Sequence, residues 1–157
     1  MLNRKVIATQ ITNLTDARYF AARGIDYLLF DLDKISLQQI LEIKEWVEGP
    51  EMLLLLSSSS LPLLDEAIIK VKPVAIAGRE ESILQDIKHL EGHVQIFDWI
   101  SDKKIVMELQ DYILIANESE LDHLRADDGV MISGGSEQAV GMKAFDQLDS
   151  VLDRLEN

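Results

Sequence analysis

The sequence predicts an α/β protein in which short parallel strands alternate with helices that pack outside them. Short apolar runs recur along the chain, and amphipathic runs with helical spacing lie between them. The chain has 157 residues, of which 47% are apolar, which is enough for one domain with a core of its own. We therefore expect a single domain over residues 1–157 with a parallel sheet, because strand–helix alternation favours that arrangement.

In the first half of the chain, capping residues separate the apolar runs. Asn13 offers an N-cap for a helix that ends near Gly24, and Ser36 with Gln39 forms a capping box for a second helix. A run of four serines then begins a third helix over 61–70. The strands predicted in this half are 5–9, 27–30, 52–56 and 74–77.

The second half of the chain continues the alternation, with one ambiguous segment. Strands are predicted at 94–97, 112–116 and 130–132, and helices at 82–90, 119–125 and in a final amphipathic run from Phe145 to Leu155. Residues 101–109 fit either a short helix or a strand. We predict a helix there, because two parallel strands cannot be joined by so few residues.

These elements favour a shortened barrel of the TIM type. Seven parallel strands, or eight if the ambiguous segment is one, follow each other with no signal of a reversal, and helices are expected outside them. The chain is shorter than the ~200 residues at the low end for that fold, so its connections must be tight. A doubly wound open sheet is the alternative.

Composition excludes several classes of function. The 28 acidic residues outnumber the 15 Lys and Arg, and a formal net charge of −13 argues against binding nucleic acid or an anionic membrane. The absence of cysteine excludes disulfides, thiolate zinc sites and a catalytic thiol. The N-terminus lacks the features of a signal peptide, and no apolar run approaches the ~20 residues of a spanning helix. We expect a cytoplasmic location.

The clearest local motif follows the last predicted strand. Ligands bind at the C-terminal ends of the strands in either fold, and Ser133, Gly134, Gly135 and Ser136 lie at such an end. Small residues there let backbone N–H groups approach an anion, so the motif predicts a phosphate-binding loop. The alternative interpretation is an ordinary turn.

Carboxylates at other strand ends are candidates for acid–base or magnesium chemistry; they are Asp31, Asp33, Glu80 and Asp98. The simpler interpretation, which we favour, is that they cap the helices that follow. The three histidines show no metal-ligand spacing, so we expect no metal site and no cofactor.

Two segments resemble the phosphoribosylanthranilate isomerase family, the barrel enzymes of tryptophan biosynthesis. Residues 6–31, VIATQITNLTDARYFAARGIDYLLFD, are similar to that family's first strand, its helix beginning with aspartate and alanine, and its second strand. Residues 129–145, GVMISGGSEQAVGMKAF, are similar to its last strand and phosphate loop. Two weaker matches lie between them: 77–80 resembles the family's H-G-D-E after strand four, and 97–99 resembles an F-D-W that opens a helix.

The same resemblance exposes departures from the family's chemistry. The general-base cysteine of the family falls on Thr9 and the glycine after it on Gln10. A threonine hydroxyl is too weak a base to replace a thiolate without an activating neighbour. The general-acid aspartate and its glycine-rich loop have no match. An A-G-G phosphate segment is replaced by one ending in Glu118, whose charge would repel a phosphate.

These observations leave three hypotheses for the function. The first is an isomerase-like protein without the family's general base and acid, which binds a small phosphorylated or anionic ligand at 133–136. The second is an active Amadori-type isomerase of the tryptophan pathway that uses Thr9 or Asp31 as base and Asp98 as acid. The third is a non-enzymatic subunit, for example a homodimer that covers apolar surface left by the shortened barrel.

Overall fold

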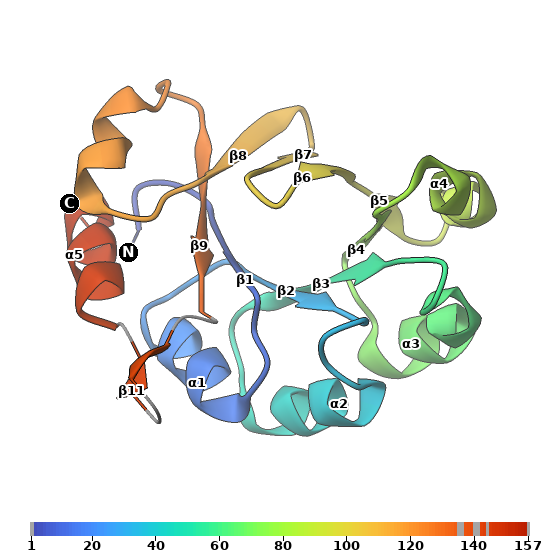
Figure 1. Cartoon of the computed structure of the whole chain (residues 1–157). Helices are drawn as coiled ribbons and strands as arrows, with labels where there is room; N and C mark the ends of the chain where they lie inside the picture. The colour runs from blue at the N-terminus through green and yellow to red at the C-terminus, as the bar shows by residue number, and fades with distance from the viewer. Residues whose placement is uncertain (1, 135–136, 140–141, 144, 157) are drawn as a thin grey trace.

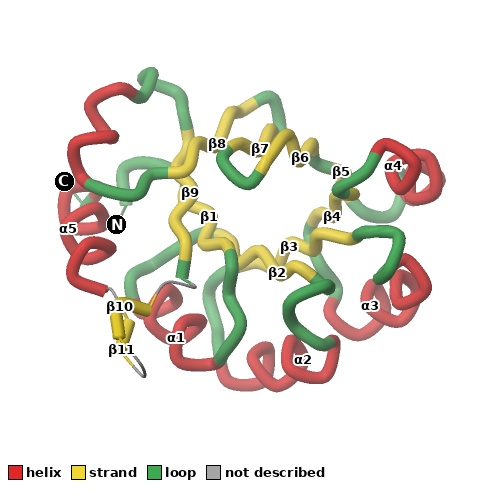
Figure 2. Tube along the Cα trace, in the orientation of Figure 1, coloured by secondary structure: helices red, strands yellow, loops and turns green. Residues whose placement is uncertain are grey.

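The computed structural model describes residues 2–134, 137–139, 142–143 and 145–156 (Figure 1). Its strands are β1 (Val6–Thr9), β2 (Tyr27–Asp31), β3 (Glu51–Leu56), β4 (Ala75–Gly78), β5 (Gln95–Ile96), β6 (Asp98–Ser101), β7 (Lys104–Met107), β8 (Gln110–Leu114), β9 (Gly129–Ser133), β10 (Glu137–Ala139) and β11 (Met142–Lys143). Its α-helices are α1 (Leu14–Ala22), α2 (Leu37–Trp46), α3 (Leu64–Val71), α4 (Glu81–Ile87) and α5 (Phe145–Leu155), and its 3₁₀ helices are η1 (Leu61–Leu63), η2 (Lys88–Leu90) and η3 (Glu118–His123). The strands form an inner ring and the helices lie outside it (Figure 2).

The first two helices begin at the predicted caps. The side chain of Asn13 accepts a hydrogen bond from the backbone N–H of Asp16 at 2.8 Å. Ser36 and Gln39 form the predicted capping box, in which each side chain accepts from the other residue's backbone N–H at 3.0–3.1 Å. These bonds satisfy N–H groups that a helix leaves unpaired at its start. Both helix starts are therefore encoded locally.

The main sheet is a nearly closed ring whose two edges are joined by the chain itself. Within the described residues its nine strands run in the order β5-β4-β3-β2-β1-β9-β8-β7-β6. The strands at the two ends, β5 and β6, are consecutive in the chain and separated by Phe97 alone, so the edges of the sheet are covalently joined. The backbone N–H of Phe97 also bonds to the carbonyl of Ile76 in β4 at 3.0 Å. This ring confirms the barrel prediction and excludes the open doubly wound sheet.

The segment 101–109 is the main correction to the sequence prediction. It contains β7, which pairs antiparallel with both β6 and β8, rather than a helix. The prediction was wrong because it assumed that every strand is parallel. An antiparallel neighbour needs only a two-residue turn, so β6, β7 and β8 form a meander where a parallel barrel would need crossover helices.

Four smaller differences concern the strand count and element boundaries. The main sheet has nine strands instead of seven or eight, because both β6 and β7 add to the seven predicted strands. The segment 97–99 was expected to open a helix; instead Phe97 joins β5 to β6, and Asp98 and Trp99 begin β6. The predicted helix 119–125 is the 3₁₀ helix η3, and the predicted helix 82–90 divides into α4 and η2.

The core has two layers, one on each face of the sheet. Alternate strand residues point inward and fill the barrel; they are Ile7, Leu29, Leu53, Leu55, Ala75, Ala77, Phe97, Ile105, Met107, Tyr112 and Met131. Their strand neighbours point outward and pack under the helices, as Val6 and Ala8 do with Phe20 of α1. The barrel is therefore packed with side chains and any ligand must bind at one of its ends.

Among the described helices, none is long and apolar enough to cross a membrane. The longest of them, α5, has 11 residues, and a spanning helix needs ~20. The cytoplasmic location and the single domain over residues 1–157 stay predictions.

Candidate functional site

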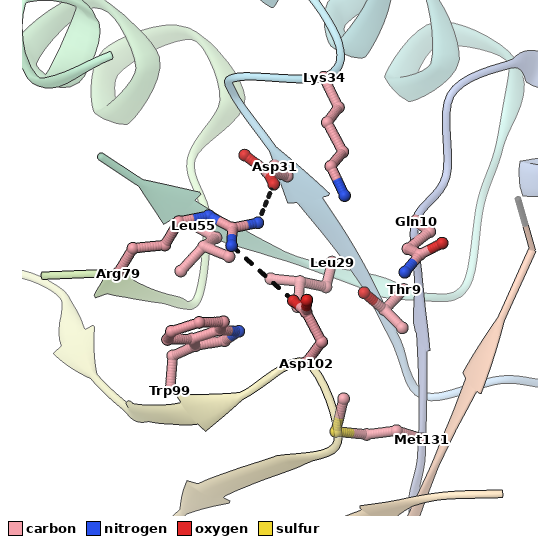
Figure 3. Close-up of a pocket in the computed structure, with 10 residues that line it drawn as sticks. All are labelled: Thr9, Gln10, Leu29, Asp31, Lys34, Leu55, Arg79, Trp99, Asp102 and Met131. Carbon is pink, nitrogen blue, oxygen red and sulfur yellow. Dashed lines mark hydrogen bonds and ion pairs between the residues drawn. The ribbon is translucent and has the colours of Figure 1, made fainter. Parts of the chain in front are cut away.

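The C-terminal ends of the strands form a mouth whose side chains continue the inward-facing rows of the barrel. Because strand side chains alternate between faces, the residue two positions after an interior residue also points inward. Thr9 follows Ile7 in this way, Asp31 follows Leu29, and Arg79 follows Ala77. Figure 3 shows Thr9, Asp31 and Arg79 facing one another across the mouth.

Arg79 occupies the centre of this mouth. Its Nη2 atom donates a hydrogen bond to the Asp31 carboxylate, and its Nη1 atom lies 3.8 Å from the carboxylate of Asp102. Its guanidinium carbon lies 4.9 Å from the centre of the Trp99 ring, within cation–π distance. The Asp31 side chain is 11% exposed and that of Asp102 is 62% exposed. The inner ion pair is therefore largely shielded from water, whereas the outer one is solvated.

These side chains leave little free space at the mouth. The cavity between them has a volume of about 10 Å³, roughly the room of one water molecule. It is lined by Thr9, Gln10, Leu29, Asp31, Lys34, Leu55, Arg79, Trp99, Asp102 and Met131. A sugar phosphate cannot enter this space unless Arg79 or Asp102 moves.

The backbone at Gln10 has a conformation that non-glycine residues rarely adopt. Its φ angle is +57°, in the left-handed region, at the position where the resemblance places a glycine. Its side chain accepts a hydrogen bond from the Ser133 hydroxyl at 3.2 Å, which ties β1 to the end of β9. Backbone strain of this kind is concentrated at functional sites, so its position beside the mouth supports a functional role for this end of the barrel.

The structure brings together only some of the predicted catalytic residues. Thr9 and Asp31 both line the mouth. Asp98 is the first residue of β6, pairs with Val106 of β7 and is exposed. Its neighbours point inward: Phe97 lies in the barrel interior and Trp99 lines the mouth. The structure therefore places Asp98 on the outer face of the sheet, away from Thr9 and Asp31.

The carboxylates at the strand ends do not converge into one cluster. Asp33 is exposed and accepts a hydrogen bond from the Ser57 hydroxyl at 2.8 Å. Glu80 is exposed at the N-cap of α4, although its side chain makes no capping hydrogen bond. In the part of the chain that the structure describes, no group of three or more His, Cys, Asp or Glu residues could hold a metal ion.

The structure describes two residues of the predicted phosphate loop 133–136, Ser133 and Gly134. Ser133 ends β9, and the backbone N–H of Gly134 donates to the carbonyl of Thr9 at 3.0 Å. A Cβ atom on Gly134 would lie 2.7 Å from Phe20 and 3.3 Å from a carboxylate oxygen of Asp16, so only glycine fits there without displacement. Gly135 and Ser136 lie outside the described residues. The Gly134 N–H is therefore engaged within the barrel.

Three tyrosines that lie away from the mouth have raised pKa values. Burial raises the pKa of Tyr112, which lies in the barrel interior in the middle of β8. Burial also raises the pKa of Tyr19, and the hydrogen bond to Asp149 adds to that effect. The pKa of Tyr27 is raised by burial as well. These shifts bear on the stability of the fold and not on chemistry at the mouth.

Sequence reasoning missed three residues that define this mouth: Arg79, Trp99 and Asp102. The first two carried a usable signal, because each stands two positions beyond an interior strand residue. Asp102 carried none, since it lies in the turn between β6 and β7, a segment predicted as helix. Its approach to Arg79 depends on the meander.

Comparison with solved structures identifies the fold. The phosphoribosyl anthranilate isomerase of Thermus thermophilus is 16% identical to this chain with a TM-score of 0.70, covering 97% of this chain and 98% of that one. The enzyme from Pyrococcus furiosus is 14% identical with a TM-score of 0.60, covering 98% and 99%. A phosphoribosyl anthranilate isomerase solved with reduced 1-(o-carboxyphenylamino)-1-deoxyribulose 5-phosphate is 14% identical with a TM-score of 0.64, covering 98% of each chain.

Neither a family model nor a curated protein matches this sequence. The resemblance drawn from residues 6–31 and 129–145 is nevertheless confirmed at the level of the fold, because the solved structures align over nearly the whole chain. The chain has the fold of the phosphoribosylanthranilate isomerases.

Proposed function

We propose that this chain is a phosphoribosylanthranilate isomerase-like protein that does not catalyse the isomerisation and binds a small phosphorylated or anionic ligand at the barrel mouth. The observation that carries the proposal is the position of Arg79, which pairs with two carboxylates at the mouth, where the remaining cavity has a volume of about 10 Å³.

The lack of a competent acid–base pair supports the loss of catalysis. Isomerisation needs one group to accept a proton and another to donate it, both within reach of the substrate. Asp31 accepts a hydrogen bond from Arg79, so its carboxylate is already engaged by a cation. The Thr9 hydroxyl makes no hydrogen bond to a base among the described residues, and Asp98 lies on the outer face of the sheet.

The anion-binding half of the proposal rests on two features of the mouth. Ser133 and Gly134 lie at the C-terminal end of β9, the end of the barrel at which this class of fold binds its ligands. Arg79 and Lys34 add two cations to the same end of the barrel. A ligand-bound isomerase with this fold was solved with a phosphate-containing analogue, which makes phosphorylated compounds the first ligands to test.

Two assays separate binding from catalysis. Complementation of an auxotroph that lacks the isomerase, together with a direct assay, is expected to show no activity. The melting temperature is expected to rise in the presence of ribose 5-phosphate or the reduced analogue. A ligand at ~100 times its Kd adds about 2.7 kcal/mol to the free energy of unfolding. Gly135→Asp should abolish the increase, whereas Gly92→Asp, in an open turn, should preserve it. Growth of the complemented auxotroph would overturn the proposed loss of catalysis. A melting temperature that no ligand changes would overturn the proposed ligand binding.

A non-enzymatic interaction subunit is the second candidate, and one observation favours it. In Figure 2 no helix of the described residues lies outside β6 and β7, and Ile100 on the outer face of β6 is 57% exposed. A homodimer could cover this face, as apolar surface at an unprotected sheet commonly indicates. Sedimentation at several concentrations tests this: a mass that stays at 17.7 kDa would exclude a stable dimer.

A further inference from the structure

We propose that Arg79 forms the centre of a binding site for a small monocarboxylate, and that the Asp102 carboxylate occupies this site until the ligand displaces it. The inference rests on the proposed function, since it names the class of anion bound at the mouth. It assigns the recognition of that anion to Arg79, which follows β4, together with Trp99 of β6 and the β6–β7 turn.

Arg79 has unused hydrogen-bonding capacity on the side that faces Asp102. A guanidinium carries five N–H donors in a planar fork. Of the described residues, only Asp31 accepts a hydrogen bond from this side chain. The 3.8 Å separation between Nη1 and Asp102 is an ion pair without a hydrogen bond. The Arg79 side chain is only 23% exposed, so its free donors have limited access to water and would gain from a better-placed carboxylate.

Asp31 and Trp99 fix the orientation of the fork. The hydrogen bond to Asp31 holds one end of the guanidinium, and the Trp99 ring lies 4.9 Å from its carbon atom. The backbone N–H of Arg79 bonds to the carbonyl of Leu56 at 2.8 Å, which anchors the residue beside β3. A preorganised fork loses little entropy when it binds a planar carboxylate.

Asp102 is the weakest partner in this arrangement. Its side chain is 62% exposed and lies on a two-residue turn, whereas the Asp31 side chain is 11% exposed and lies at the end of a central strand. Exposed ion pairs contribute little to stability, so displacing Asp102 costs little. The carboxylate that already stands at this position shows which chemical group the site accepts.

The balance of charge favours a monoanion. Lys34 lines the same cavity and makes no ion pair with any of the described residues. Arg79 and Lys34 thus face Asp31 and Asp102, and the four charges cancel. A monocarboxylate that replaces Asp102 preserves this neutrality, whereas a phosphate dianion would leave an excess negative charge close to Asp31.

The opposite wall of the mouth offers neutral donors to the ligand. Gln10 uses its carbonyl oxygen to accept from Ser133 at 3.2 Å, and its amide nitrogen lies on the side of Thr9 in Figure 3. The Thr9 hydroxyl lines the same cavity. These groups suit a carboxylate whose remaining part carries a polar substituent or a compact ring, because the space beyond Arg79 is small.

Benzoate and its neutral isostere benzamide test the inference directly. The chain has two tryptophans, so Trp46→Phe leaves Trp99 as the sole fluorescent reporter at the site. We expect a saturable change in Trp99 fluorescence with benzoate and none with benzamide. Asp102→Asn should tighten binding about two- to five-fold, the range implied by the strength of an exposed ion pair. Arg79→Lys should weaken it about tenfold, because an ammonium lacks the planar fork.

Controls separate the site from general charge and from folding. Asp86→Asn removes the same charge from the exposed face of α4 and should not change affinity. If Arg79→Lys fails to fold in a thermal scan, Asp102→Asn and Lys34→Gln still test the site. The inference is overturned if benzoate gives no saturable signal, if benzamide matches it, or if Asp102→Asn leaves the affinity unchanged.

The outcomes also separate this inference from the proposed function. Stabilisation by ribose 5-phosphate without a response to benzoate would preserve the proposed function and overturn the carboxylate site. Benzoate binding that depends on Arg79 in a protein that nevertheless complements the auxotroph would preserve the carboxylate site and overturn the proposed loss of catalysis.

Discussion

The ring of Tyr112 lies against Gly129, its partner in the parallel pairing of β8 and β9. A Cβ atom built on Gly129 would lie 2.4 Å from Cδ1 of that ring. Tyr112 is only 2% exposed, so the ring has little room to move. The glycine is therefore required by the packing of the barrel interior and not by a turn.

Gly129→Ala is expected to lower the free energy of unfolding by about 1–3 kcal/mol, the usual cost of adding a methyl group to a packed core. Urea denaturation measures the change. Gly92→Ala is the matched control, because no atom lies within 4 Å of a Cβ atom at that position. If Gly129→Ala lowers the free energy of unfolding no more than Gly92→Ala does, the Tyr112 ring moves aside freely.

The turn between β7 and β8 is expected to gain stability from a double substitution. Glu108 and Leu109 have φ angles of +55° and +63°, which a type I′ turn requires and which ordinary residues adopt at a cost. Glu108→Asn with Leu109→Gly should raise the free energy of unfolding by about 1 kcal/mol. Lys103→Gly in the β6–β7 turn is the control and should not stabilise, since the φ angle of Lys103 is not positive.

The Asp31–Arg79 pair is expected to behave as one unit in a double-mutant cycle. Arg79→Gln leaves a shielded carboxylate without its cation and should cost about 1–3 kcal/mol. Asp31→Asn in the same chain should recover part of that loss, because the two amides can hydrogen-bond to each other. Chemical denaturation of the four proteins measures the coupling. Strictly additive losses would show that the pair contributes no mutual stabilisation.

Alkaline pH is expected to destabilise the protein through its tyrosines. The pKa values of Tyr19, Tyr27 and Tyr112 are all raised in the folded state, with burial as the largest cause. A raised folded-state pKa gives stability that is complete below the unfolded value, about 10, and is lost as the pH rises beyond it.

Absorbance of tyrosinate should therefore increase above about pH 10 together with the loss of helical circular dichroism, and not before it. Tyr112→Phe removes one of these buried hydroxyls and should make the decline in stability with pH less steep. Tyrosinate absorbance that appears in the folded protein near pH 10 would contradict this prediction.

The sequence predicted features that depend on neighbours in the chain. The caps at Asn13 and Ser36 are local hydrogen bonds, and the four apolar runs of the first half became β1 to β4 at nearly the predicted positions. The phosphate motif was placed correctly at the end of β9, since Ser133 is the last residue of that strand. Its proposed role as an anion site stays a prediction.

The candidate site was predictable only in part. Thr9 and Asp31 stand at the mouth because strand periodicity and the barrel class put them there. Asp98 was placed at the same rim because a strand was expected to end at Phe97, whereas a second strand, β6, begins at Asp98. Side chains alternate along a strand, so Asp98 lies on the face opposite to that of Phe97 and Trp99.

The sequence by itself determined the α/β class, the helix starts and the alternating inward and outward rows, because these follow from local hydrogen bonds and from the periodicity of apolar residues. Only the tertiary structure decided the direction of β7, the closure of the ring at Phe97 and the charge pair across the mouth. A strand's direction is set by the edges available to it, and Arg79 meets Asp31 across 48 positions of sequence only after the barrel has closed.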